Sequence, residues 1–283
     1  KAIELDDNLI LAKTLLGMTY MQMGDYDKAM EICTAALKKS EALKDKLWVG
    51  RSLRFIGNVY LYKNKFKDAY DFYLRALKIG EEVNDKSNIA GILLNIGSIY
   101  EIKDDFKAAS NYYRRALEIA EEIGDNKSKN LVLSRMGMVH YKKGDYDKAL
   151  DYYGRSLAIR EELGDKRGVA GSLNDISLVH CKKGDYEKAL DCNTRSLKIQ
   201  EELGDKQGVA EQLGVIGYIY KIKGDLDKAL DYYDRSLTIQ EEISDKARVA
   251  LILNNIGHTH YFKGDYEKAL DYYDRSLAID EEL

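Results

Sequence analysis

A period of 40 residues runs through almost all of this 283-residue chain and restricts what it can fold into. One column of the period is glycine except for a single serine: Gly17, Gly57, Gly97, Gly137, Ser177, Gly217 and Gly257. A second column is alanine throughout: Ala29, Ala69, Ala109, Ala149, Ala189, Ala229 and Ala269. A fixed period in this range is typical of stacked repeats, in which each unit packs against its neighbours. The sequence therefore predicts an array and not a globular domain with one closed core.

Each repeat has the pattern of two amphipathic helices joined by short turns. In the repeat at 205–243, Gly204 suits a helix C-terminus and Asp205 an N-cap, which predicts a first helix over about 206–223. Its apolar stripe is Leu213, Ile216, Gly217 and Tyr220. A second glycine-aspartate turn precedes a second helix over about 226–243. We call these helix A and helix B, and neither can bury its apolar face alone.

Glycine inside helix A calls for a reason, because it costs about 1 kcal/mol relative to alanine. Six of the seven repeats nevertheless carry glycine in the Gly217 column. We infer that helix B approaches closely there, with the alanine column, Ala229 in this repeat, as its small partner. A large side chain at Gly217 should overpack the pair.

The second repeat shows the motif most fully, as Leu53-x2-Ile56-Gly57-x2-Tyr60, then Ala69-x3-Tyr73 and Ala76. This resembles the tetratricopeptide repeat family, whose signature is W-x2-L-G-x2-Y, then A-x3-F and a further alanine and proline. Leucine replaces the tryptophan, except for Lys13 in the first repeat, and a Gly-Asp-Lys turn replaces the proline. Serine replaces the second alanine at Ser156, Ser196, Ser236 and Ser276. The repeat length is 40 residues instead of the usual 34. In this respect the chain is similar to the long-repeat arrays of kinesin light chains, cell-polarity adaptors and bacterial signalling proteins.

The resemblance implies an all-α, right-handed superhelical solenoid of seven antiparallel helix-turn-helix repeats. Residues 1–9 are expected to end a helix of a preceding repeat. The seven repeats are expected at 10–49, 50–89, 90–129, 130–169, 170–209, 210–249 and 250–283. Because the chain begins without methionine and stops where other repeats continue into Gly-Asp-Lys, we expect it to be a segment of a longer array.

Composition argues against several classes of protein. The net charge of -4 is small and the charges are interleaved, so no basic stripe indicates nucleic acid. The sequence shows no apolar run of membrane-spanning length and no signal peptide at its start. Cys33, Cys181 and Cys192 are odd in number and irregularly spaced, which argues against a disulfide framework or a zinc site. A cytoplasmic location is predicted, with a secreted or periplasmic one left open.

The repeats differ from one another mainly on one face of helix A. The columns of Arg54, Asn58 and Leu61, spaced i, i+4, i+7, hold Met, Leu, Tyr, Asn and His in other repeats. In the tetratricopeptide repeat family this face lines a concave groove and binds peptides. Unconstrained drift is the alternative, but drift usually gives Lys, Glu and Asp. The predicted groove residues are Arg51, Arg54, Asn58, Tyr62, Asn95, Ser98, Glu101, Arg135, Met138, Tyr141, Asn174, Tyr218, Lys221, Asn254, Asn255, His258 and Tyr261.

Two sets within this group suggest ligand chemistry. Arg54, Asn58, Asn95 and Arg135 resemble the carboxylate clamp of chaperone-binding members of the family, although Leu131 stands where a second lysine belongs. Two guanidinium groups and two amides suit a peptide's terminal carboxylate. The other set combines amides and aromatic rings that suit an extended backbone: Asn254, Asn255, His258, Tyr261 and Phe262.

No pattern of catalytic, metal-binding or cofactor-binding residues emerges, so we predict neither an enzyme nor a cofactor. His140, His180 and His260 fall in the Tyr60 column and are interpreted as packing substitutes for tyrosine. The predicted function is a scaffold that binds a peptide or protein segment in the helix A groove. The alternatives are a sensor region of a larger signalling enzyme, such as a kinase, cyclase or caspase-like protease, and an array that self-associates end to end through its last helix.

Overall fold

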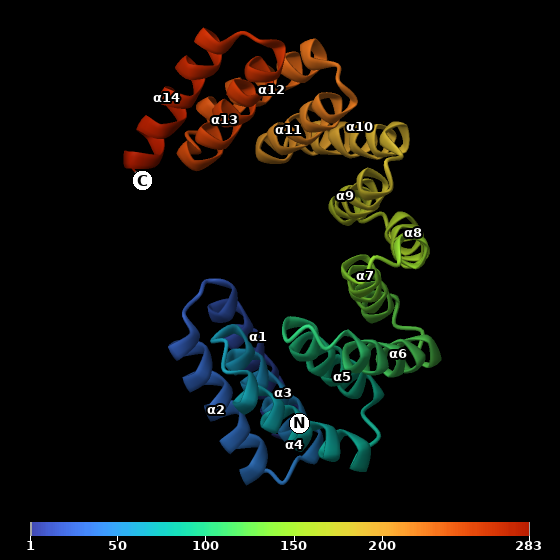
Figure 1. The fold of residues 1–283 in the computed structure, drawn as a ribbon. Helices are drawn as coiled ribbons and strands as arrows, with labels where there is room; N and C mark the ends of the chain where they lie inside the picture. Colours follow the sequence, from blue (N-terminus) through green and yellow to red (C-terminus); the bar gives the residue numbers. More distant parts are fainter. Residues whose placement is uncertain (1, 283) are drawn as a thin grey trace. The chain divides into compact units, whose positions relative to one another are not determined.

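The computed structural model describes residues 2–282, with side chains from residue 9 onward, and this range is almost entirely helical (Figure 1). Its fourteen helices are α1 (Ala2–Gln22), α2 (Tyr26–Ala42), α3 (Lys46–Tyr62), α4 (Phe66–Glu82), α5 (Lys86–Ile102), α6 (Phe106–Glu122), α7 (Asn126–Lys142), α8 (Tyr146–Glu162), α9 (Lys166–Lys183), α10 (Tyr186–Leu203), α11 (Lys206–Lys223), α12 (Leu226–Glu242), α13 (Lys246–Lys263) and α14 (Tyr266–Glu282). The predicted all-α fold of seven consecutive helix pairs is confirmed for the described residues, and the handedness of the superhelix remains a prediction.

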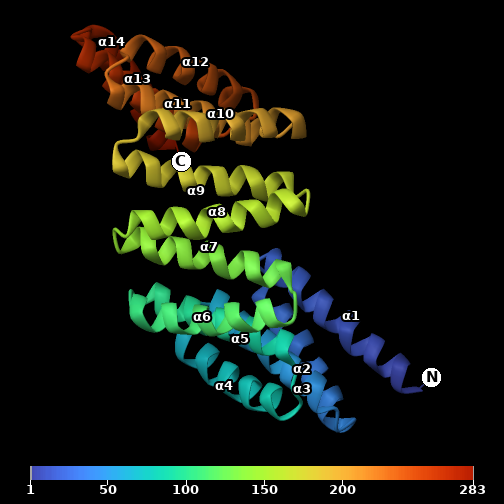
Figure 2. The same ribbon diagram turned by 90° about the vertical axis from the view of Figure 1, so that its right-hand side faces the viewer.

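The helices form two compact units, one ending at Asp145 and the other beginning at Tyr146. In the first unit α1, α3 and α5 each pack against the following B helix, and each of these B helices packs against the next A helix. The second unit repeats this arrangement from α8 to α14, and Figure 2 shows its successive helices running antiparallel. A helices also contact one another, as α3 and α5 do in the first unit and α11 and α13 in the second.

Helix boundaries follow the predicted turns closely. Helix A and helix B of the representative repeat are α11 (Lys206–Lys223) and α12 (Leu226–Glu242), against predictions of 206–223 and 226–243. The first helix runs without a break from Ala2 to Gln22, so it continues through the predicted limit between residues 9 and 10. The predicted repeat limits at 50, 90 and every 40 residues thereafter fall on the fifth residue of an A helix. The division into repeats by those limits remains a prediction.

A left-handed residue followed by an aspartate ends nearly every helix and starts the next. Positive φ angles recur at 20-residue intervals from Gly24 to Gly264, on eight glycines and on Lys44, Asn64, Asn84, Asp104 and Ser244. The aspartate that follows caps the next helix, as Asp205 does by accepting a hydrogen bond from the Gly208 amide at 3.0 Å. The left-handed residue and the capping aspartate together fix the length of each helix and therefore the period of the repeat.

The glycine column is the position where helix A meets a tyrosine ring from helix B. A Cβ atom at Gly57 would lie 2.6 Å from Tyr73 Cε1, and one at Gly217 would lie 2.9 Å from the Tyr233 ring. The predicted alanine partner also lies close, but farther than the tyrosine ring: the Ala229 carbonyl oxygen would be 3.2 Å from a Cβ atom at Gly217. Tyr73 and Tyr233 are completely buried, so in these two hairpins the glycine makes room for a large core side chain.

Later hairpins add a hydrogen bond between the two helices at the position of the family's second alanine. Ser236 Oγ donates to the Ala210 carbonyl oxygen at 2.7 Å, and Ser276 Oγ donates to the Ala250 carbonyl oxygen at 2.9 Å. Both serines are buried. The bond satisfies a hydroxyl that would otherwise be costly to bury, so serine is tolerated there in place of alanine.

The turn geometry gives a stability prediction. Ser244 has φ of 59°, which strains a side-chain-bearing residue but not glycine, so Ser244→Gly is expected to stabilise the chain by about 0.5–1 kcal/mol. Thr238→Gly, at an exposed position inside α12, is the control and should destabilise by about 0.3–0.5 kcal/mol, the difference between the helix propensities of threonine and glycine. Urea unfolding followed by circular dichroism measures both, and equal destabilisation by the two substitutions would contradict the strain argument.

Candidate functional site

Predicted groove residues in the first unit gather around one cavity of about 520 Å³ between the A helices α3, α5 and α7. Six of them line it: Asn58, Tyr62, Asn95, Ser98, Glu101 and Arg135. Leu61, Leu94, Ile102 and Leu131 supply apolar wall. The cavity therefore combines amide, carboxylate and guanidinium groups with hydrocarbon, as a surface that binds a mixed ligand requires.

Hydrogen bonds within this cavity hold its polar groups in a fixed arrangement. Asn58 Oδ1 accepts from Asn95 Nδ2 at 2.7 Å and from the Tyr73 hydroxyl at 2.8 Å. Glu101, although 6% exposed, accepts from the Tyr113 hydroxyl at 2.7 Å and from Lys142 Nζ at 3.4 Å. The tyrosines that fill the glycine column thus also hold the polar residues of the A helices.

The four predicted clamp residues line two different cavities, and the clamp remains a prediction. Asn58, Asn95 and Arg135 share the cavity, but Arg54 lies in a separate cavity of about 260 Å³ with Trp48 and Arg51. The Arg54 guanidinium lies 5.1 Å from the Phe55 ring centroid, and burial lowers its pKa. A Cβ atom at Gly91 would clash with Arg54 Nη1, so the bare glycine of the next A helix gives the side chain its space.

The remaining arginine of this region, Arg51, is engaged in an ion pair. Its Nε lies 2.8 Å from Asp85 Oδ2, and the Asp85 side chain is 6% exposed. The Glu101 carboxylate in the neighbouring cavity would repel a second carboxylate. Arg51 and Arg54 therefore line a different cavity from Asn58, Asn95 and Arg135, and the Glu101 carboxylate disfavours a carboxylate ligand beside these three residues.

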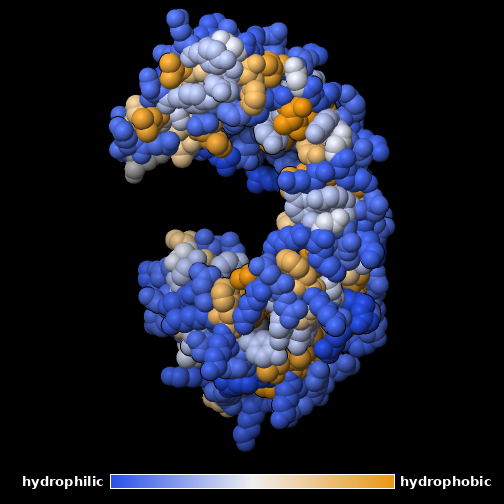
Figure 3. All heavy atoms as spheres, viewed as in Figure 1, coloured by the Kyte–Doolittle hydropathy of each residue, from blue (hydrophilic) through white to orange (hydrophobic). Residues whose placement is uncertain are grey.

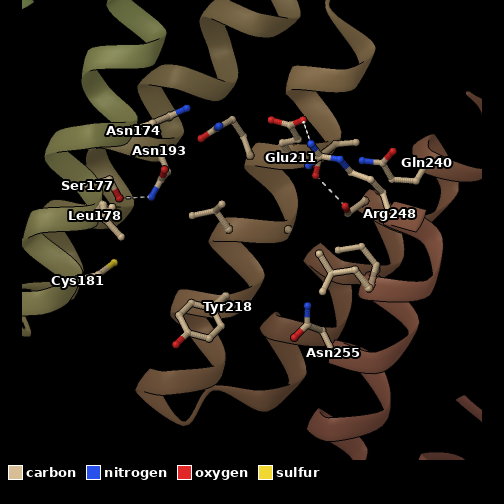
Figure 4. Close-up of a pocket in the computed structure, with 17 residues that line it drawn as sticks. Asn174, Ser177, Leu178, Cys181, Asn193, Glu211, Tyr218, Gln240, Arg248 and Asn255 are labelled. Atoms are coloured by element: carbon tan, nitrogen blue, oxygen red, sulfur yellow. Dashed lines mark hydrogen bonds and ion pairs between the residues drawn. The ribbon is translucent and has the colours of Figure 1, made fainter. Parts of the chain in front are cut away.

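The second unit has a cavity of about 460 Å³ lined by five successive helices, α9 to α13 (Figure 4). Of the predicted groove residues, Asn174, Tyr218 and Asn255 line it. Leu178, Val215, Leu251 and Ile252 form most of its apolar wall. On the face drawn in Figure 3, hydrophobic residues of each unit form small groups within a mainly hydrophilic surface.

A paired exception to the glycine–tyrosine contact lies at this cavity. Ser177 stands in the glycine column, and Asn193 stands where Tyr73 and Tyr233 lie in other hairpins. Asn193 Nδ2 donates to Ser177 Oγ and, at 2.9 Å, to the Ala189 carbonyl oxygen. Asparagine is much shorter than tyrosine, so the exchange leaves unfilled space beside α9 and satisfies the new hydroxyl at the same time.

The opposite wall of the cavity carries an ion pair and buried amides. Arg248 Nη2 lies 2.8 Å from Glu211 Oε1, and Arg248 Nε lies 3.6 Å from Asp245 Oδ2. Gln212 and Gln240 are 3% and 1% exposed, respectively. Ser236 also lines the cavity, but its hydroxyl is used in the bond to α11.

A fourth cavity, of about 540 Å³, adjoins Tyr218 and contains further predicted residues. It is lined by Tyr218, Lys221 and His258 together with Phe262. Lys221 Nζ lies 5.1 Å from the Tyr218 ring centroid, and the His258 and Phe262 rings meet edge to face at 4.7 Å. The remaining predicted residues, Met138, Tyr141, Asn254 and Tyr261, line none of these four cavities.

Comparison with sequence families identifies the architecture. The profile described as tetratricopeptide repeat matches residues 9–82, 65–122, 128–202 and 210–282. The chain belongs to the tetratricopeptide repeat family. No curated protein matches it as a relative.

Solved structures share this tetratricopeptide repeat fold at low sequence identity. The STAND protein with a tetratricopeptide repeat sensor from Pyrococcus horikoshii has a TM-score of 0.83 and 19% identity over 99% of this chain and 43% of its own. BtubC from P. vanneervenii has a TM-score of 0.64 and 22% identity, and the match covers 75% of this chain and 87% of BtubC. The Rap conjugation gene regulator of plasmid pLS20, in complex with the Phr* peptide, has a TM-score of 0.61 and 19% identity over 95% and 73%.

Sequence reasoning missed the polar half of the cavity in the second unit. Glu211, Gln212, Gln240 and Arg248 lie outside the three variable columns that were compared, and Gln240 comes from a B helix. The signal for Asn193 is visible in the chain, because its column reads Cys33, Tyr73, Tyr113, Tyr153, Asn193, Tyr233 and Tyr273. A tetratricopeptide repeat that loses this tyrosine should be examined for a cavity.

His260, Cys33 and Cys181 are packed among other side chains of the fold. His260 stacks on Tyr272 with ring centroids 5.6 Å apart, as Tyr100 stacks on Tyr112 at 5.5 Å, so it replaces tyrosine in a packed pair. Burial raises the pKa of the Cys33 thiol to about 11 and also raises that of Cys181.

In the range 2–282 no group of three or more His, Cys, Asp or Glu side chains is placed to hold a metal ion. No helix there is both long and apolar enough to cross a bilayer.

The paired exception can be reversed by mutation. Asn193→Tyr alone should destabilise the chain by about 1–3 kcal/mol, because the ring would overlap Ser177 Cβ. The double variant Ser177→Gly with Asn193→Tyr should recover that loss, because it restores the contact seen at Gly217. Urea unfolding of the two single variants and the double variant gives the coupling energy. Additive effects of the two substitutions would show that the ring does not pack against this column.

Proposed function

We propose that this chain is a non-catalytic scaffold that binds a peptide or protein segment along the exposed face of its A helices. One observation supports the proposal most. In each unit, side chains from successive A helices line cavities that mix unfilled apolar wall with amide groups. The B helices instead supply the buried tyrosines that hold the A helices in place.

The chemistry of this face suits an extended chain. Asparagine side chains both donate and accept hydrogen bonds, so Asn174 and Asn255 can pair with a peptide backbone. Leu178 and Leu251, 45% and 58% exposed, offer apolar surface for the side chains of such a peptide. The Rap regulator of plasmid pLS20, which shares the fold, is solved with the Phr* peptide, and this supports a peptide as the class of ligand.

A second candidate function is the sensor region of a larger signalling enzyme. It is favoured by the similarity to the Pyrococcus horikoshii STAND protein with a tetratricopeptide repeat sensor, of which the chain spans 43%. In that case the catalytic domain would lie outside these residues, and ligand binding to the A helices would control it. A cytoplasmic location fits both functions, and Cys33, Cys181 and Cys192 are all free thiols.

Selection of peptides from a random displayed library tests the proposal. Peptides enriched on the wild-type chain should lose at least about tenfold in binding to Tyr218→Ala or Arg135→Ala, because these residues line the two main A-helix cavities. Arg115→Ala, an exposed arginine on the B helix α6, is the matched control and should bind as the wild type does. Failure to enrich any peptide, or equal loss in the control, would contradict the proposal.

A further inference from the structure

Three amide side chains that line the cavity of the second unit have a polar atom without a partner. These atoms are Asn174 Oδ1, Gln212 Oε1 and Gln240 Oε1, each enclosed by protein and unbonded among the described residues. Gln212 and Gln240 are among the most buried polar side chains of the unit, at 3% and 1% exposed. A buried polar atom without a partner is costly, so a cavity that gathers three of them is suited to a ligand that satisfies them.

Two other polar side chains in the cavity, Asn193 and Ser236, are already hydrogen-bonded within the protein and do not compete for these amides. Asn193 is bonded to Ser177 and to the Ala189 carbonyl oxygen, and the Ser236 hydroxyl is bonded to the Ala210 carbonyl oxygen. In Figure 4 Asn174 lies on the α9 side of the cavity and Gln240 on the α12 side, with Tyr218 below them. The unsatisfied groups therefore enclose the cavity from different helices.

The charge of the lining is balanced. Glu211 is the one carboxylate and Arg248 the one guanidinium among the lining residues, and they pair with each other at 2.8 Å. A charged ligand group that entered the cavity would lose its hydration and would find no unpaired residue of opposite charge. An aliphatic ligand group would form no hydrogen bond and would leave all three amides unsatisfied. The lining thus favours a neutral group that forms several hydrogen bonds.

We infer that this cavity binds a primary carboxamide, the side chain of a glutamine or asparagine in the bound peptide. The inference rests on the proposed function, since it names the residue that the A-helix surface selects. A carboxamide presents two N–H donors and one carbonyl acceptor, so it can pair with amide side chains whichever way these are turned. Its methylene groups would lie against the apolar wall formed by Leu178, Val215 and Ile252.

The repeats supply replacements that the fold already accepts at these positions. The Gln212 column holds Ile92 and Ile252, and the Gln240 column holds Ala120, so Gln212→Ile and Gln240→Ala each introduce a residue used elsewhere in the same column. Gln200 occupies the Gln240 column one hairpin earlier and also has an unpartnered Oε1, but it does not line the cavity. Gln200→Ala is therefore the matched control.

The test is a random displayed peptide library selected in parallel on the wild-type chain, on Gln212→Ile with Gln240→Ala, and on Gln200→Ala. The inference predicts enrichment of glutamine or asparagine at one peptide position on the wild type and on the control. It also predicts that this preference falls at least tenfold in the double variant. Thermal unfolding of each variant without peptide shows that it is folded, and Gln212→Ile should unfold at a higher temperature because it removes an unpartnered amide.

The outcomes separate this inference from the function on which it rests. Enriched peptides that show no carboxamide preference, or that prefer lysine, arginine, glutamate or aliphatic residues at the responsive position, would overturn the inference and leave the peptide-binding function in place. A carboxamide preference that survives the double variant would also overturn it. Absence of any enriched peptide on the wild type would overturn the proposed function and the inference together.

Discussion

The contact of a buried tyrosine ring with a bare glycine backbone is the interaction on which the rest of the structure depends. Tyr73 on Gly57, Tyr113 on Gly97 and Tyr233 on Gly217 each fill the space that a Cβ atom would need. The contact sets how closely helix A and helix B approach. Because the ring hydroxyls of Tyr73 and Tyr113 reach through to Asn58 and Glu101, it also positions polar groups on the far side of helix A.

This dependence explains why variation is confined to one face. At the glycine and alanine positions a larger side chain would clash with the neighbouring helix. On the other face of helix A the columns of Arg54, Asn58 and Leu61 hold residues of varied size and polarity. In the first hairpin Cys33 replaces the tyrosine beside an unchanged Gly17. The hairpin of α9 and α10 changes two columns together, as Ser177 and Asn193, and the cavity of the second unit lies beside that change.

Much of the fold could be predicted from sequence because its determinants are local. A left-handed residue, glycine at eight turns, recurs at 20-residue spacing and is followed by aspartate at nearly every turn. The predicted bounds of α11 agree with the structure at both ends. The cavities were predicted less well, because each takes residues from several helices. Arg54 and Asn58 lie four residues apart on one helix and were expected to act together, yet the space beside Gly91 places Arg54 elsewhere. Gln240 was missed because it reaches the cavity from a B helix.

The central claim is that ligand binds along the A helices, with Gln240 contributed by a B helix, while the buried tyrosines of the B helices maintain the packing. Methyl-group NMR of the chain, titrated with a peptide selected on it, tests this most directly. The account predicts that shift changes concentrate on exposed A-helix methyl groups such as Leu178, Val215 and Leu251. Exposed B-helix methyl groups such as Leu74 and Leu270 should remain unchanged. Shift changes centred on the B-helix groups would contradict the account.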